Sequence, residues 1–89
     1  MKILENKVLI KLFSPELDTS FDIFIPVNES IYKIKKLIVK YFEDFTNTAL
    51  NNKSYILINK LNSRIYKNNE IVRNTDIRNS SELLFVSIN

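Results

Sequence analysis

The chain has 89 residues, of which 45% are hydrophobic, and its formal net charge is +3. This length provides one hydrophobic core, so we expect a single domain spanning residues 1–89. The chain contains no Cys and no His. These absences exclude disulfides and thiolate chemistry and remove the commonest metal ligand and general base. We therefore expect no enzymatic activity, no cofactor and no metal site.

Residues 7–13 and 21–27 predict two strands, because apolar side chains alternate along both segments. The segment between them contains Pro15 and Asp18, which are typical of turns. Pro26 has no N–H for a ladder hydrogen bond, so it favours an edge position for the second strand. The side chains expected to face the core are Val8, Ile10, Leu12, Phe21, Ile23, Ile25 and Val27.

The apolar period then changes from two to about 3.6, which predicts a helix over residues 31–45. Ser30 precedes the first apolar position and has the side chain of an N-cap. The side chains that this period assigns to the core are Ile31, Ile34, Leu37, Ile38, Tyr41, Phe42 and Phe45.

The second half of the chain predicts a strand over residues 55–60, a short strand over residues 64–66 and a last strand over residues 82–88. Residues 71–81 look irregular, with Ile71, Val72 and Ile77 as inward anchors. The order ββαβββ predicts an α+β fold, with one helix packed on a mixed sheet of four or five strands. Since the chain has no Gly and twelve Asn, we expect Asn at left-handed backbone positions.

Two segments resemble ubiquitin. The helix start Ser30-Ile31-Tyr32-Lys33-Ile34 resembles the Thr-Ile-x-x-Val start of the ubiquitin helix. Residues 72–86 resemble its closing segment Leu-x-x-Tyr-Asn-Ile-x-x-x-Ser-x-Leu-x-Leu-Val. The resemblance covers about residues 7–88, mainly as a hydrophobic pattern, and implies a ubiquitin-like β-grasp fold.

The chain also resembles the bacterial YukD/EsaB-like family, which is associated with type VII secretion in low-GC Gram-positive bacteria. The shared features are the size, the missing C-terminal di-glycine and the segment Phe-Asp-Ile-Phe-Ile-Pro-Val before the helix. This resemblance implies an accessory or regulatory component of a type VII (ESAT-6-like) secretion system.

Conjugation and sulfur carriage by ubiquitin-like proteins need a C-terminal Gly-Gly, whereas this chain ends Val86-Ser87-Ile88-Asn89. We therefore expect a protein that is not conjugated. The longest apolar runs, such as residues 55–58, are too short for a membrane span or a signal peptide. The prediction is a cytoplasmic protein without membrane insertion.

Alternation along the strands leaves large apolar side chains on the face away from the core. If Leu57, Leu83 and Phe85 point inward, their neighbours point outward. The last strand of ubiquitin-like proteins lies between the first and third, which would gather the outward residues into one patch. A contiguous exposed apolar patch is typical of an interaction surface. The predicted protein-binding patch consists of Leu9, Phe13, Ile56, Ile58, Leu84 and Val86.

The expected partner of this patch is another protein, such as a component of a secretion machine, or a second copy of the chain. Dimerisation or a terminal segment covering the patch, or an inverted face assignment, remains an alternative.

The helix offers a different candidate surface, because Lys33, Lys36 and Lys40 form a basic face and no acidic residue occurs between positions 30 and 42. The alternative function is a basic surface that binds nucleic acid or acidic partners. The plainer interpretation is a solvated helix face in a Lys-rich chain. We expect no nucleic acid as partner, because the chain has only three Arg and its aromatic residues occur at core spacing. The scattered carboxylates predict no catalytic pair.

Overall fold

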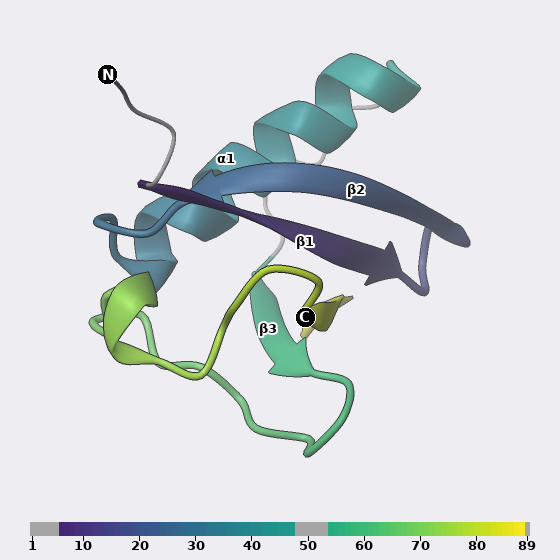
Figure 1. Cartoon of the computed structure of the whole chain (residues 1–89). Helices are drawn as coiled ribbons and strands as arrows, with labels where there is room; N and C mark the ends of the chain where they lie inside the picture. The colour runs from purple at the N-terminus through teal and green to yellow at the C-terminus, as the bar shows by residue number, and fades with distance from the viewer. Residues whose placement is uncertain (1–5, 48–53, 89) are drawn as a thin grey trace.

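The computed structural model describes residues 6–47 and 54–88. One helix covers one face of a four-stranded sheet, which gives the molecule two layers (Figure 1). The elements in chain order are β1 (Lys7–Ser14), β2 (Thr19–Pro26), α1 (Ile31–Thr46), β3 (Tyr55–Asn59), the 3-10 helix η1 (Val72–Asn74) and β4 (Glu82–Ser87).

The sheet has the strand order β2-β1-β4-β3. Strands β1 and β4 run parallel, and the other neighbouring pairs run antiparallel, so the sheet is mixed. The expected α+β architecture and the central last strand are confirmed. Pro26 ends the edge strand β2, as its missing N–H predicted. The predicted short strand over residues 64–66 is wrong, because this segment makes only an isolated bridge between Ile65 and Ile58.

The core lies between the inner face of the sheet and α1. Ile10 and Leu12 of β1, Leu57 of β3, and Leu83 and Phe85 of β4 are all at most 1% exposed. These residues alternate with exposed or half-buried ones, as a strand of period two requires. The half-buried residues at the margin of this core include Val8, Ile23 and Val27.

Helix α1 begins where predicted, because the Ser30 hydroxyl accepts a hydrogen bond from the Lys33 N–H at 3.2 Å. Its buried residues are Ile31, Ile34, Ile38 and Phe42.

Three helix residues assigned to the core are exposed instead, so this part of the prediction is wrong. Leu37, Tyr41 and Phe45 are 48%, 37% and 65% exposed. A helix that rests on a sheet buries only one stripe, and these residues flank it. The rings of Tyr41 and Phe45 instead contact the edge of the core at Phe21, with ring centroids 5.2 and 4.6 Å away.

A polar cluster orders the segment between β3 and β4. The Tyr66 hydroxyl donates to Asp76 at 2.5 Å and accepts from the Asn59 amide at 3.1 Å. Arg64 pairs with Glu70 at 2.8 Å and with Asp76 at 3.5 Å. Burial and the hydrogen bond to Asp76 raise the pKa of Tyr66 to about 12. The hydrogen bond from Tyr66 lowers the pKa of Asp76.

The backbone turns without glycine at four described positions with positive φ. These positions are Asp18, Asn47, Ser63 and Ser80. Only Asn47, the C-cap of α1, is an asparagine. The expectation that Asn would take the left-handed positions therefore holds at the helix end and fails at the other three.

Candidate functional site

The six residues of the predicted protein-binding patch are all half-buried, and they lie on strands β1, β3 and β4. Their immediate neighbours on the strands are buried, except Val8 and Ser87, which are half-buried. Leu84 and Val86, for example, flank Phe85, which is fully buried. The outward set therefore occupies the face of the sheet opposite α1, which we call the outer face.

The strand register brings five of these six residues together. Ile58 pairs with Leu84 across β3 and β4, and Ile56 pairs with Val86 one step further along. On the other side of β4, Phe13 pairs with Leu84 in the parallel ladder. Side chains of directly paired residues lie on the same face and in contact range. Leu84 is therefore the residue at the centre, with Phe13 and Ile58 on either side.

Leu9 is separated from this group by a row of charged residues that crosses all four strands. The register aligns Asp22, Lys11 and Glu82, and Lys60 follows on β3. Lys11 pairs with Asp22 at 3.8 Å, and Lys60 pairs with Glu82 at 3.5 Å. Beyond this row, Leu9 lies opposite Phe24, an exposed residue of edge strand β2. The prediction that Leu9 adjoins the other five residues is wrong.

Sequence reasoning missed two members of the apolar surface. Ile65 is 56% exposed and bridges to Ile58, so both side chains lie on the same face. Ile88 is 51% exposed and continues the alternation of Leu84 and Val86. That alternation could have identified Ile88, whereas Ile65 depends on the course of the loop after β3. We define the outer apolar patch as Phe13, Ile56, Ile58, Ile65, Leu84, Val86 and Ile88.

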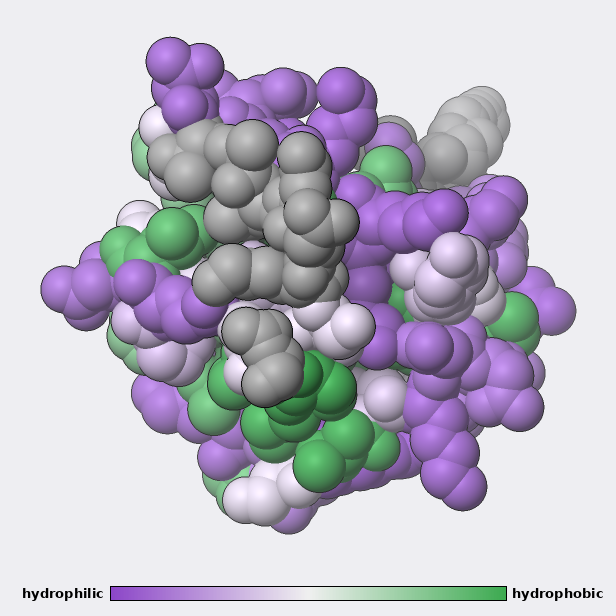
Figure 2. Space-filling model, turned by 180° about the vertical axis from the view of Figure 1, so that it is seen from behind, coloured by the Kyte–Doolittle hydropathy of each residue, from purple (hydrophilic) through white to green (hydrophobic). Residues whose placement is uncertain are grey.

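The outer apolar patch has a sharp polar border on the side of the charged row. Seen from the side opposite to Figure 1, most of the surface is hydrophilic, and the largest group of hydrophobic residues forms one compact area (Figure 2). Single exposed apolar side chains are ordinary on a protein surface, but a contiguous group with a polar rim is typical of an interaction site.

The three lysines of the predicted basic face lie on α1, on the other side of the sheet from the outer apolar patch. Lys33 pairs with Glu29 and Lys40 with Asp44, both at 3.9 Å and both exposed. Lys36 lies over the ring of Tyr32, with its Nζ 4.8 Å from the ring centroid. Exposed pairs of this kind contribute little to stability. The three lysines therefore form a solvated face whose positive charge is partly balanced.

Within residues 6–47 and 54–88, no group of three or more Asp or Glu residues lies close enough to hold a metal ion. No helix of the same residues is long and apolar enough to cross a membrane. The outer apolar patch contains no ionisable side chain. Its geometry therefore supports contact with another apolar surface and no proton transfer.

No protein-family model and no curated protein sequence matches this chain. Solved structures do match its fold. The EccD5 ubiquitin-like domain from Mycobacterium xenopi aligns with a TM-score of 0.67 at 8% identity, over 93% of this chain and 96% of that domain. This chain has the ubiquitin-like β-grasp fold. The architecture implied by the resemblance to ubiquitin is thereby confirmed.

Two further matches show how widely the fold is used. A chain of the ESX-5 inner membrane complex aligns with a TM-score of 0.67 at 10% identity, over 93% of this ubiquitin-like chain but only 21% of that chain. A chain of a toluene 4-monooxygenase complex aligns with a TM-score of 0.76 at 5% identity, over 92% of this chain and 99% of that one. Likeness at such identities establishes the fold alone, so the function has to be argued from the surface.

Proposed function

We propose that this ubiquitin-like chain is a protein-binding module without enzymatic activity and that its partner docks on the outer apolar patch. The observation that carries the proposal is the grouping of seven apolar residues on one face of the sheet, next to a row of charges; five come from β1, β3 and β4, and Ile65 and Ile88 lie outside the strands. Binding energy concentrates in a few central residues that lose contact with water. Leu84 is therefore the expected hot spot, with Ile58 and Phe13 beside it.

The cellular role proposed for this module is that of an accessory or regulatory component of a bacterial type VII secretion system, acting in the cytoplasm. The resemblance to the YukD/EsaB-like family supports this role. The fold likeness to the EccD5 ubiquitin-like domain and to a chain of the ESX-5 inner membrane complex also supports it. The partner in this proposal is a component of the secretion machine, and a second copy of the chain is the alternative partner.

The outer apolar patch is tested by a matched pair of substitutions, Leu84→Asp and Phe24→Asp. Both place a carboxylate on the outer face, but Phe24 lies on β2 beyond the charged row and is 64% exposed. The tagged parent and both variants are used to capture proteins from cells of the native host, with quantitative mass spectrometry. We expect Leu84→Asp to lose the partners that the parent and Phe24→Asp retain.

Two measurements complete this experiment. Circular dichroism melts verify that both variants fold, and sedimentation velocity tests whether the lost partner is a second copy of the chain. Retention of every partner by a folded Leu84→Asp variant contradicts the proposal. A complex that weakens steeply with salt indicates phosphate or acidic contacts instead, because apolar association responds little to salt.

A further inference from the structure

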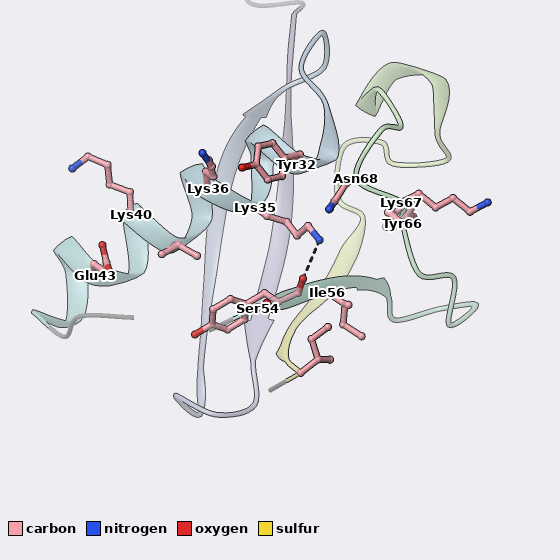
Figure 3. Close-up of a pocket in the computed structure, with 13 residues that line it drawn as sticks. Tyr32, Lys35, Lys36, Lys40, Glu43, Ser54, Ile56, Tyr66, Lys67 and Asn68 are labelled. Carbon is pink, nitrogen blue, oxygen red and sulfur yellow. Dashed lines mark hydrogen bonds between the residues drawn. The ribbon is translucent and has the colours of Figure 1, made fainter. Parts of the chain in front are cut away.

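A groove between α1 and edge strand β3 lies apart from the centre of the outer apolar patch. It has a volume of about 800 Å³. Helix residues from Tyr32 to Glu43 form one wall, and β3 with residues 66–68 forms the other (Figure 3). Its only residues shared with the outer apolar patch are Ile56 and Ile88, at the edge of the sheet.

The charged side chains that line the groove are mostly positive. Four lysines line it, Lys35, Lys36, Lys40 and Lys67, whereas Glu43 is the only acidic residue among the described lining. Within the described residues, the ammonium groups of Lys35, Lys36 and Lys67 form no ion pair. Lys33, in contrast, does not line this groove. The helix lysines that line the groove are therefore not the three that the sequence assigned to the basic face.

Lys35 crosses the groove, and its ammonium donates a hydrogen bond to the Tyr55 backbone carbonyl at 2.9 Å (Figure 3). Partial burial lowers the pKa of Lys35. A cation that loses part of its hydration and has only a neutral carbonyl as partner is stabilised by any anion that approaches it. The lysines at the rim, Lys40 and Lys67, extend outward at opposite ends of the groove (Figure 3).

The second feature is the edge of β3 that faces away from β4. The next segment covers the strand only in part, since Tyr66 donates to the Leu57 carbonyl and Asn59 donates to Arg64. These hydrogen bonds do not include Tyr55. Its backbone carbonyl accepts from the Lys35 side chain rather than from a neighbouring strand. An extended segment can add to a sheet at such an edge, where main-chain hydrogen bonds provide affinity and side-chain pockets provide specificity.

The dimensions fit an extended polypeptide. From Tyr32 to Glu43 the helix rises about 16 Å, which is the length of about five extended residues. Lys36 and Lys40 are separated by a rise of about 6 Å, close to the spacing of about 7 Å between alternate side chains of a strand. The wall opposite these lysines includes Ile56 of β3. Because alternate side chains of an extended segment point to opposite sides, acidic residues toward Lys36 and Lys40 alternate with apolar residues toward Ile56.

We propose that the α1–β3 groove is a second binding site, which takes an extended acidic segment of another protein in which acidic and apolar residues alternate. Carboxylates of the segment meet Lys36 and Lys40, its apolar side chains contact Ile56, and its backbone runs beside Tyr55. This site shares Ile56 and Ile88 with the outer apolar patch but not its centre at Leu84, so Leu84→Asp tests the two sites separately.

The probe is the peptide Asp-Val-Glu-Leu-Asp-amide with fluorescein on its N-terminus, and its control is Asp-Glu-Asp-Val-Leu-amide with the same label, which has the same composition without alternation. Binding is measured by fluorescence anisotropy and by amide chemical shifts of the ¹⁵N-labelled full chain. We expect the alternating peptide to shift the amides of Tyr55, Ile56 and Val39. The control peptide should bind at least threefold more weakly.

The matched variants are Lys36→Glu inside the groove and Lys33→Glu one turn away from it. Lys36→Glu should weaken the alternating peptide at least tenfold, Lys33→Glu less than threefold, and Leu84→Asp should leave it unchanged. Equal losses for both lysine variants, or no shift of groove amides at millimolar peptide, overturn the proposal. It is also overturned if a single-stranded oligonucleotide binds the same residues more tightly than the peptide.

Discussion

Both faces of the sheet carry large apolar side chains, and the faces differ in what covers these side chains. Leu83 points inward and is 1% exposed, because α1 and the rest of the core close over it. Leu84 is the next residue of the same strand, yet it is half-buried on the outer face, where no described element lies over it. Hydrophobic side chains on the inner face stabilise the fold, whereas those on the outer face are available to a partner.

The largest difference between the faces should appear in stability. Leu83→Ala is expected to lower the free energy of unfolding by about 2–5 kcal/mol, because it leaves a cavity in a closed core. Leu84→Ala should cost about 1 kcal/mol, since only part of its apolar area is buried. Urea denaturation of the two variants measures both values. Equal losses would mean that the outer face is covered in solution by the chain itself.

The next largest effect concerns the polar cluster that fixes the loop beside the outer apolar patch. Tyr66→Phe should lower the free energy of unfolding by about 1–3 kcal/mol, because it removes the hydroxyl that bridges Asn59 and Asp76. Thermal melts at neutral pH measure the loss.

The same cluster predicts a pH dependence. The pKa of Tyr66 is raised to about 12 in the folded chain, above the ordinary value of 10.0. Its contribution to stability is therefore complete below pH 10 and is lost as the pH rises toward 12. Asp76 has a lowered pKa, so its contribution is lost as the pH falls below its ordinary value of 3.8. Tyr66→Phe should reduce the alkaline loss, whereas the part that is due to the raised pKa of Tyr55 remains. An unchanged alkaline profile in that variant would contradict the assignment.

The smallest effect on stability is expected from Glu82→Leu in the charged row. Its ion pair with Lys60 is exposed, so the free energy of unfolding should change by less than about 1 kcal/mol. The substitution also removes one charge from the row that separates Leu9 and Phe24 from the outer apolar patch. Sedimentation velocity should then detect stronger self-association than in the parent. If the variant associates no more strongly than the parent, the charged row does not prevent self-association through the outer face.

Strand alternation made the inner and outer faces predictable from the sequence, because a period of two leaves no intermediate position. Leu57, Leu83 and Phe85 are buried as expected. The fold was predictable for the same reason, together with the single change of period at Ser30.

Other features depend on geometry that residue order does not specify. The separation of Leu9 follows from the parallel register of Lys11 with Glu82, which joins distant parts of the chain. Leu37 was assigned to the core because a period of 3.6 leaves flanking positions ambiguous. The α1–β3 groove was not predictable, since it depends on how Lys35 reaches the Tyr55 carbonyl.

The central claim, that the outer apolar patch is the docking surface, is tested most directly by methyl NMR of the isoleucine side chains. The chain is labelled at its Ile δ1 methyl groups and titrated with the captured partner, or concentrated alone if the partner is a second copy. The account predicts that the signals of Ile56, Ile58 and Ile65 shift or broaden first, while those of Ile34 and Ile38 in the core stay in place. Changes confined to Ile23, which packs at the margin of the core on the inner face, would contradict it.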